Sequence, residues 1–335
     1  MNKAEADTQF ATKTALVTGA NSGLGFEAAA QLAEAGYGCV ILACRSLEKA
    51  ESAKQALVER VGGNPFETIA VDVSSIESVA AASDELIARK QSIDSLILNA
   101  GLVAGDEMQK SVDEIEITFA ASMIGHHIMT MRLVDAGLLP EGARVVLVGS
   151  SVANNDTPAF MGMTVYDFGT DASSEFGDNL HEAMLAFAKG TKPELYTSGR
   201  YYATTKLFSA WWSAAMVRRF GERISVFTVG PGPNMGTNVG RHQKGFMKFM
   251  MSTLMPLIGS VMGMNQPTSA GAKRYLDVLH NVGQEFVSGK TYMSPPKTPI
   301  GPLTEVVYPH VVDEERQEIA WAVLTELTGV SEVEK

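Results

Sequence analysis

One pair of residues in the sequence is suited to moving a proton, Tyr202 and Lys206. A spacing of four places their phenol and ammonium groups on the same face of a helix. A free phenol titrates at about pH 10, which is too high for a base at neutral pH. A cation held close favours the phenolate and moves its pKa toward a useful range. The pair therefore indicates general acid/base chemistry, although the same spacing is common on solvent-exposed helices.

A hydroxyl group suited to binding a reacting oxygen lies upstream of this pair. The aliphatic stretch 144–148 predicts a strand, and Gly149, Ser150 and Ser151 follow it directly. A serine at the end of a strand can donate a hydrogen bond to a substrate carbonyl and stabilise the charge that develops there. The two serines are therefore candidates for an oxyanion-stabilising group.

A glycine-rich loop separates the first predicted strand, 14–18, from the helix that follows it. Glycines allow a tight turn and let backbone N–H groups approach a pyrophosphate, and the helix N-terminus adds its positive dipole. A lone glycine pattern can be a simple turn, but its place between first strand and first helix is the one a dinucleotide site requires. The candidate pyrophosphate-binding residues are Gly19, Asn21, Ser22, Gly23, Leu24 and Gly25.

The end of the second predicted strand indicates which dinucleotide binds. An acidic residue there would hold the ribose hydroxyls of NAD, but the sequence has Cys44 followed by Arg45. A carboxylate would repel a 2′-phosphate, whereas a guanidinium pairs with it through two hydrogen bonds. We therefore expect NADP(H) as the cofactor, with Arg45 on its 2′-phosphate, although Arg45 is also compatible with a plain surface role.

Two further strand ends complete a nucleotide cleft. Asp72 and Val73 follow the third strand, where a side chain can meet the adenine. Asn99, Ala100 and Gly101 follow the fourth strand, where small residues let the ribose approach the backbone. Each of these short motifs is ordinary alone, but their order along the chain is specific.

In combination, these motifs resemble the short-chain dehydrogenase/reductase family over roughly residues 12–293. The matching residues are TGANSGLG at 18–25, NAG at 99–101, the serine after strand five, YATTK at 202–206 and Pro231-Gly232. The resemblance implies that Tyr202 is the general acid/base, and that Lys206 holds the nicotinamide ribose and tunes Tyr202. It also aligns Ser150 with the family serine that orients the reacting oxygen, and it places Pro231 and Gly232 at the cofactor.

Within the family, the resemblance is greatest to the branch of retinol dehydrogenases and light-dependent protochlorophyllide reductases. The sequence ACRS after strand two, VGS after strand five and a long insertion before the tyrosine support this. Two departures matter. Ser122 replaces the family's asparagine, which helps to seat a water in a proton relay to the lysine. Pro233 stands where the protochlorophyllide reductases carry a cysteine, so we expect dark carbonyl or alcohol chemistry instead of photoreduction.

The elements that position these residues alternate between strands and helices, which predicts a doubly wound parallel sheet of the Rossmann type. Predicted strands are 14–18, 38–44, 67–71, 95–98, 144–148, 224–229 and 291–293. Predicted helices are 24–35, 47–61, 76–90, 112–138, 202–220, 268–281 and 314–327. We expect one domain, 12–335, after a polar N-terminal tail, 1–11. Residues 152–201 form the insertion, and the apolar, Met-rich segment 240–264 is expected to be a substrate lid rather than core.

Composition narrows the function further. Lys and Arg number 27 against 38 Asp and Glu, a formal net charge of −11, which disfavours nucleic acid as a partner. No apolar stretch is long enough to cross a bilayer, so we expect no integral membrane association. The six histidines and two cysteines lack metal-ligand spacing, and the low thiol content suggests the cytoplasm. The sequence is compatible with a homo-oligomer.

The sequence thus predicts an NADP(H)-dependent oxidoreductase that interconverts a carbonyl and an alcohol on a bulky, apolar small molecule. Two alternatives stay open: a non-catalytic NADP(H)-binding sensor that binds partners, and reduction of a C=C bond. A sugar-nucleotide epimerase of the extended type also uses Tyr and Lys four apart. The spacing of Gly19, Gly23 and Gly25 disfavours the epimerase, whose glycines follow a different pattern.

Overall fold

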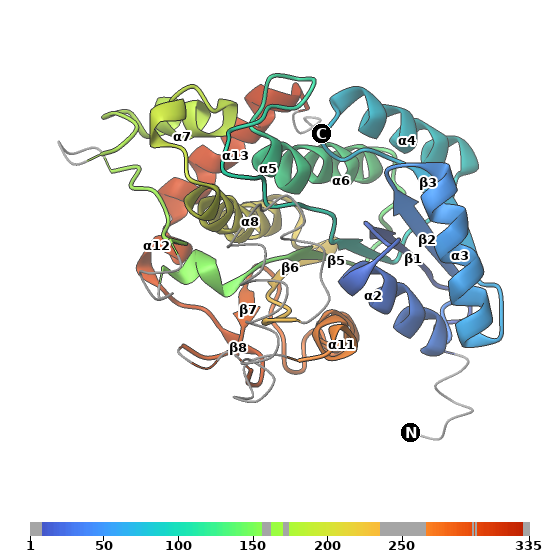
Figure 1. Cartoon of the computed structure of the whole chain (residues 1–335). Coiled ribbons are helices and arrows are strands. Elements are labelled where there is room, and N and C mark those ends of the chain that lie inside the picture. Colours follow the sequence, from blue (N-terminus) through green and yellow to red (C-terminus); the bar gives the residue numbers. More distant parts are fainter. Residues whose placement is uncertain are drawn as a thin grey trace.

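The computed structural model contains an eight-stranded sheet with the strand order β3-β2-β1-β4-β5-β6-β7-β8 (Figure 1). All neighbouring strands are parallel except β7 and β8, which are antiparallel. The structure describes residues 9–155, 162–169, 174–234, 266–296, 298 and 300–330. The predicted doubly wound parallel sheet is confirmed. The strands are β1 (Thr14–Thr18), β2 (Cys39–Cys44), β3 (Phe66–Ala70), β4 (Ser95–Leu98), β5 (Ala143–Val148), β6 (Ile224–Val229), β7 (Thr291–Met293) and β8 (Thr304–Glu305).

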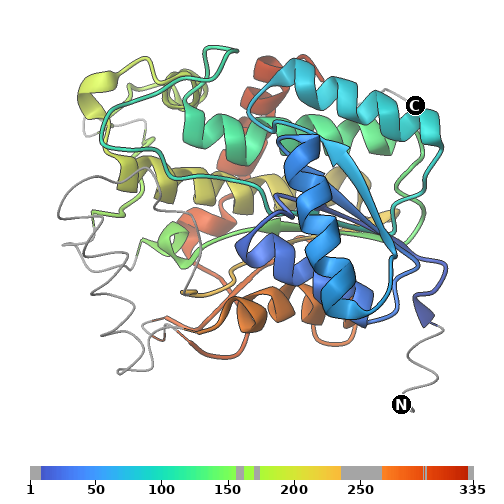
Figure 2. The ribbon, with the colours of Figure 1, turned by 45° about the vertical axis from the view of Figure 1, so that its right-hand side comes forward.

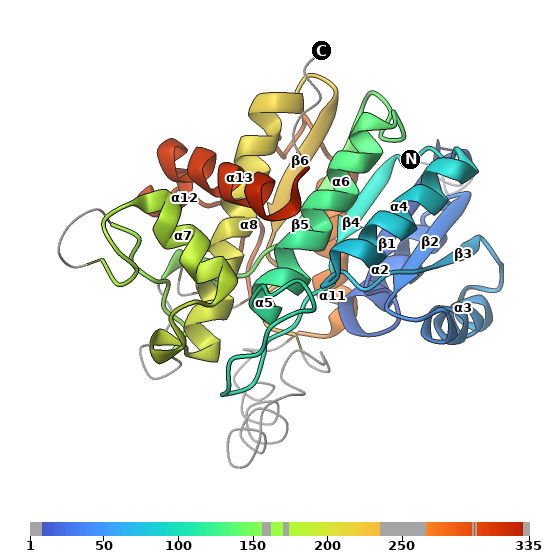
Figure 3. The same ribbon diagram turned by 90° about the horizontal axis from the view of Figure 1, so that it is seen from above.

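Helices cover both faces of the sheet, as the burial of successive strand residues requires. One layer contains α2 (Gly23–Glu34), α3 (Leu47–Val61) and α11 (Thr268–His280), with α11 packed against α2 (Figure 2). The other contains α4 (Ile76–Arg89), α6 (Gly125–Asp135) and α8 (Ser198–Phe220), which lie over the strands in Figure 3. In β1, Leu16 packs in the core beneath the second layer and Val17 in the core beneath the first.

The C-terminal part of the chain adds a third group of elements beside α8. Helix α13 (Glu314–Thr328) packs against both α8 and α7 (Leu180–Lys189), and α12 (Pro309–Val312) also contacts α8. Arg219 joins α8 to α13 through Glu318, at 2.6 Å, and its guanidinium lies over the Trp321 ring. Short turns η2 (Ser151–Asn154) and η4 (Pro193–Leu195) belong to the predicted insertion.

The expected helix over 112–138 is wrong at its start. The Ser111 hydroxyl accepts from the backbone N–H groups of Asp113 and Ile115, and such local bonds compete with a helix. Helical structure begins only at α5 (Ile117–Phe119), where the Glu116 carboxylate caps Phe119 at 2.9 Å. It then continues through a π-helical turn, η1 (Ala120–Ile124), into α6.

Two regions named in the sequence analysis are described only in part or not at all. The proposed lid, 240–264, lies outside the described residues. Of the N-terminal tail 1–11, the described part includes Phe10, whose ring stacks on Tyr37 with centroids 4.8 Å apart and on His280. The chain therefore packs against the first helix layer before β1 begins.

Candidate active site

The candidate residues meet because β1, β4, β5 and β6 are parallel neighbours and end at the same edge of the sheet. The strand order reverses between β1 and β4, and an open α/β sheet forms its ligand crevice at such a point. Thr18, Asn99, Ser150 and Pro231 each follow or end one of these strands. Residues separated by more than two hundred positions thus come to one crevice.

The glycine loop has the geometry of a phosphate cradle. Gly19 has φ +68°, in the left-handed region, and a Cβ on Gly25 would lie 2.4 Å from the Gly19 carbonyl oxygen. Only glycine lets the loop turn and lets α2 approach it this closely. Ser22 precedes α2 in an extended conformation and makes no side-chain cap, so the N-terminal N–H groups of α2, at Gly23 and Leu24, are left for another acceptor. These features fit a dinucleotide pyrophosphate.

Thr18, at the end of β1, ties the glycine loop to the segment after β4. Its buried hydroxyl oxygen accepts from the backbone N–H groups of Asn99, at 2.8 Å, and Ala100, at 2.9 Å. The Asn99 amide in turn donates to the Thr18 carbonyl at 2.9 Å. This reciprocal set holds the two nucleotide-binding segments in register.

The Thr18 hydroxyl also meets His126, and the contacts define the histidine tautomer. Burial lowers the pKa of His126 to about 3, so the ring is neutral. His126 Nδ1 lies 3.0 Å from the Ser122 carbonyl, which only accepts, so Nδ1 carries the proton. Nε2 therefore accepts from Thr18 Oγ1, at 3.1 Å. A continuous hydrogen-bonded chain joins the π-helical turn to the nucleotide loop.

Ser122 lies in that π-helical turn and is 1% exposed. Its hydroxyl oxygen has no hydrogen-bond partner among the described residues. A Cβ built on Gly101 would lie 3.1 Å from this oxygen, so Ser122 stands directly against the Asn99–Gly101 segment. A buried hydroxyl without an internal partner costs stability, and such groups call for an explanation in function.

The other predicted nucleotide contacts lie at the ends of β2 and β3. Arg45 follows β2 and is exposed. The Asp72 carboxylate accepts from both the backbone N–H and the hydroxyl of Ser74, at 3.0 and 2.6 Å, so part of its hydrogen-bonding capacity shapes the turn. Val73 is buried beside it. Asp72 thus stabilises the turn after β3 through Ser74. A contact of Asp72 with adenine stays a prediction.

The three candidate catalytic side chains come together at the end of β5. The Ser150 hydroxyl is hydrogen-bonded to the Tyr202 side chain. Lys206 is 6% exposed, and its ammonium donates to the Val148 carbonyl at 2.7 Å. The same ammonium lies 5.8 Å from the centroid of the Tyr202 ring. Helix α8 begins at Ser198, earlier than predicted, so Tyr202 is in its second turn and is held on both sides by helix.

The electrostatics of this group differ from the expectation that Lys206 lowers the pKa of Tyr202. Burial raises the pKa of Tyr202, and among the described residues only the Ser150 hydrogen bond opposes this effect. Lys206, whose ammonium donates to the Val148 carbonyl, is not among the groups that shift this pKa. Burial also lowers the pKa of Lys206 to about 8. At neutral pH the Tyr202 phenol is therefore protonated.

An aromatic cluster from the insertion supports the start of α8. Tyr201, the neighbour of the catalytic candidate, is fully buried and stacks on Phe187 of α7 with centroids 4.4 Å apart. Tyr166 packs edge-on against Tyr201, and its backbone N–H donates to Thr204 at 3.0 Å. Part of the insertion is therefore core that packs against the first turns of α8, the helix that carries Tyr202.

Two residues that were not predicted from the sequence donate hydrogen bonds to backbone carbonyls of the segment that contains Pro231 and Gly232. Gln266 donates its side-chain amide to the Pro231 carbonyl. Arg274, 7% exposed, donates to the Gly230 carbonyl at 3.3 Å and to Gly301 at 2.7 Å. A polar residue on the inner face of α11 was the available signal for Arg274.

Thr18 and His126 were also missed as site residues. Thr18 was identifiable as a polar residue that follows three aliphatic residues at the end of a strand. The histidine pair 126–127 was expected to be core or interface, and both side chains are buried, at 1% and 0% exposed. The role of His126 in joining two loops depends on a contact across 108 positions of sequence, which no local pattern reveals.

Within the ranges that the structure describes, no group of three or more His, Cys, Asp or Glu side chains is placed to hold a metal ion. Among the same residues, no helix has the length and apolar character needed to span a membrane.

Comparisons with known proteins agree with this geometry. The family model described as short chain dehydrogenase matches residues 13–167. WW domain-containing oxidoreductase of Drosophila melanogaster is 28% identical over 74% of this chain and 55% of its own. Retinol dehydrogenase 14 of Mus musculus is 31% identical over 69% of this chain and 63% of its own. The chain thus spans less than two thirds of the length of these two relatives.

Solved structures share the fold. A short-chain dehydrogenase from Burkholderia cenocepacia in complex with NADP aligns with a TM-score of 0.58, over 84% of this chain and 95% of its own, at 20% identity. At this identity the likeness shows the fold alone. With the glycine loop, the serine and the Tyr-Lys pair at one sheet edge, the chain belongs to the short-chain dehydrogenase/reductase family, within its retinol dehydrogenase-like branch.

Proposed function

We propose that the protein is an NADP(H)-dependent oxidoreductase that interconverts a carbonyl and an alcohol on a bulky, apolar small molecule. The observation that carries the proposal is the Ser150–Tyr202–Lys206 group at the end of β5, next to the glycine cradle. A phenol, a hydroxyl and an ammonium in this arrangement surround a reacting oxygen with donors and supply it with a proton.

In the direction of reduction, Tyr202 donates its phenolic proton to the carbonyl oxygen. Ser150 donates a hydrogen bond to the same oxygen as negative charge develops there. The phenolate left behind is reprotonated from solvent. In the direction of oxidation, the phenolate removes the proton of the alcohol.

NADPH, when bound, supplies the hydride. Gly19, Asn21, Ser22, Gly23, Leu24 and Gly25 would hold its pyrophosphate, and Arg45 its 2′-phosphate. Asp72, Val73, Asn99, Ala100 and Gly101 would line the adenosine end, and Pro231 and Gly232 the nicotinamide end. Lys206 has three N–H donors and uses one on Val148, so two remain for the nicotinamide ribose.

The apolar substrate is proposed from two considerations. The relative from Mus musculus is named a retinol dehydrogenase, and retinol is a large apolar alcohol. The Met-rich segment 240–264 follows Pro231-Gly232 closely in sequence, and methionine side chains adapt to bulky apolar ligands. The cytoplasmic location and a homo-oligomeric state stay predictions from the sequence.

The test compares Tyr202→Phe with Tyr201→Phe as its matched control. The first change removes the transferable proton and keeps the ring. The second removes a neighbouring buried hydroxyl that has no hydrogen-bond partner among the described residues. Turnover of NADPH on a panel of apolar and small carbonyls is expected to fall roughly 10²–10⁴-fold for Tyr202→Phe and to be little changed for Tyr201→Phe.

The affinity for NADPH, measured by direct titration, is expected to survive both changes. If Tyr202→Phe keeps most of its turnover, another group supplies the proton and the assignment fails. If the native protein binds NADPH but turns over no member of the panel, the result favours the NADP(H)-sensing alternative.

A further inference from the structure

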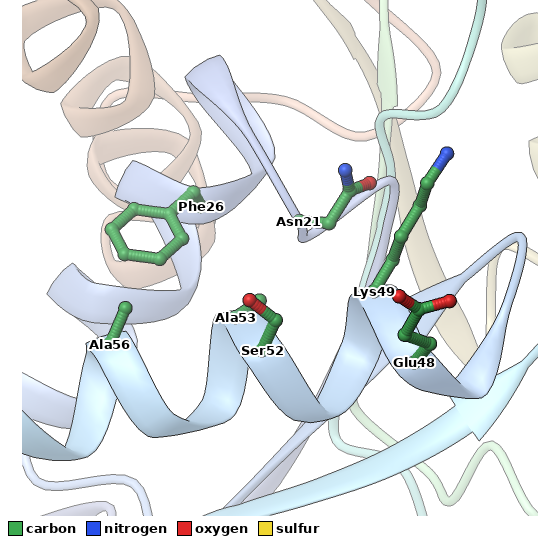
Figure 4. A pocket seen from close by; sticks show the side chains of 7 residues that line it. All are labelled: Asn21, Phe26, Glu48, Lys49, Ser52, Ala53 and Ala56. Atoms are coloured by element: carbon green, nitrogen blue, oxygen red, sulfur yellow. The ribbon is translucent and has the colours of Figure 1, made fainter.

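The two ends of the crevice use their polar side chains in different ways. At the glycine-loop end, a pocket of about 280 Å³ lies between α2 and α3, and the Asn21 and Lys49 side chains are among those that line it (Figure 4). At the other end, the polar side chains around Pro231 and Gly232 donate to carbonyls of the chain's own backbone. Side chains of this second kind hold a backbone segment in place, whereas those of the first kind are accessible to a ligand.

Four consecutive backbone carbonyls, those of residues 230–233, accept hydrogen bonds from within the protein. The donors are the Arg274 side chain to Gly230 at 3.3 Å, the Gln266 side chain to Pro231, the Asn234 side chain to Gly232 and the Gln266 N–H to Pro233 at 3.1 Å. Pro231 and Pro233 have no N–H group of their own. The N–H groups of Gly232 and Asn234 have no acceptor among the described residues, so this part of the backbone keeps donors for a ligand.

Arg274 connects segment 230–233 to two other parts of the chain. Its guanidinium group also donates to the Ser294 hydroxyl, just after β7, at 3.0 Å and to the Gly301 carbonyl at 2.7 Å. A Cβ built on Gly232 would lie 3.4 Å from Arg274 Nη1 and 3.0 Å from Gln266 Nε2. The end of β6 therefore packs directly against these two side chains, and Arg274 joins it to the chain that follows β7.

The charge of Arg274 is balanced by no carboxylate within ion-pair distance among the described residues. Asp277, one turn further along α11, is paired with Lys273 instead. Arg274 is 7% exposed, and burial lowers its pKa. A buried cation that is held by neutral groups costs stability, so its place beside the crevice calls for an explanation in function.

We propose that Arg274 is a positioning residue for the nicotinamide half of NADP(H), and that it acts through segment 230–233. This rests on the proposed function, which assigns Pro231 and Gly232 to the nicotinamide end, and extends it by naming a residue that determines how firmly that end is held. With its carbonyls bonded internally, the segment has the Gly232 and Asn234 N–H groups to offer. The carboxamide oxygen of nicotinamide is an acceptor suited to such donors.

The experiment compares a probe that contains nicotinamide with one that lacks it. Isothermal titration of NADPH and of 2′,5′-ADP is carried out on the native protein, Arg274→Gln and Arg274→Lys. Arg274→Gln is expected to weaken NADPH on the order of tenfold, the worth of a charge-assisted hydrogen bond, and to leave 2′,5′-ADP within about twofold. Arg274→Lys is expected to lose less, because lysine keeps the charge but lacks the planar fork that reaches several acceptors at once.

Arg144→Gln is the matched control. Arg144 also donates to a backbone carbonyl of α11, that of Leu279, but it lies at the start of β5, at the opposite edge of the sheet. Thermal unfolding of each variant sets a titration temperature at which it is folded, and if Arg274→Gln does not fold, the same comparison on Arg274→Lys decides.

Two results would overturn the proposal in different ways. If the Arg274 variants weaken NADPH and 2′,5′-ADP equally, or weaken NADPH no more than Arg144→Gln does, Arg274 has a structural role alone and the proposed function stands. If the native protein binds neither probe, the assignment of the cofactor itself is wrong, and the role of Arg274 falls with it.

Discussion

Replacing Thr18 by valine tests whether one hydroxyl holds the nucleotide crevice together. Valine keeps the shape of the side chain but removes the oxygen that accepts from Ala100 N–H and donates to His126 Nε2. The Ala100 N–H and His126 Nε2 would both lose the Thr18 hydroxyl as a partner. Thr18 itself is 0% exposed, so water does not readily replace it. The Asn99 N–H is less affected because it also lies 3.1 Å from the Ile97 carbonyl.

An unpaired buried polar group costs about 1–3 kcal/mol, so the two losses together predict a destabilisation of roughly 2–6 kcal/mol. Urea unfolding followed by circular dichroism measures this change, and Thr18→Ser is the control because it keeps the hydroxyl and loses only a methyl group. We expect the serine variant to lose about 1 kcal/mol. We also expect the valine variant, under conditions where it is folded, to bind NADPH more weakly. A valine variant within about 1 kcal/mol of the native protein would refute the hydrogen-bond argument.

Two more predictions concern the catalytic group. Because burial lowers the pKa of Lys206 to about 8 from an ordinary 10.5, the ammonium is present below pH 8 and is lost above it. kcat/KM for NADPH is therefore expected to fall as pH rises through about 8, and a profile flat to pH 10 would contradict this role of Lys206. Ser122→Ala is expected to keep or raise the free energy of unfolding, because its buried hydroxyl has no partner among the described residues, and yet to lower kcat. An unchanged kcat would remove Ser122 from the active site.

The positions of the site residues were predictable to the extent that they follow strands. Thr14–Thr18, Ser95–Leu98 and Ile224–Val229 have the bounds that their aliphatic patterns predict. Parallel strands place their C-terminal ends at one edge, so the residues after them were expected to meet. The helix over Leu47–Val61 was equally predictable from the sequence, because Ser46 caps its start and Gly62 ends it.

The differences arise where an element depends on contacts distant in sequence. The start of 112–138 looked helical because its apolar residues recur at helical spacing, but Ser111 bonds the local backbone instead. Helix α7 was overlooked in the insertion, although Asn179 caps it through Glu182 N–H and Gly190 ends it. The short edge strand β8 pairs with β7 through two residue pairs, too few for a pattern.

The pKa values of the proposed catalytic pair were the feature of the site that was hardest to predict from the sequence. A spacing of four correctly places Tyr202 and Lys206 on one helix face, but it does not reveal that Val148 takes the ammonium. The pKa of a phenol depends on burial as well as on charge, and here burial dominates. The sequence identifies Tyr202 and Lys206 as the two groups. The protonation state of the Tyr202 phenol depends on the packing around it, which the sequence does not show.

Transfer of deuterium from NADPH labelled at the reactive carbon of its nicotinamide tests the central claim most directly. The native protein is incubated with each labelled epimer and a bulky apolar ketone or enal, and the product is analysed by mass spectrometry. We predict an alcohol that carries one deuterium, from one epimer only, on the former carbonyl carbon. A saturated carbonyl labelled at the carbon of the former C=C bond, or an NADPH-binding protein that transfers no label, would contradict the account.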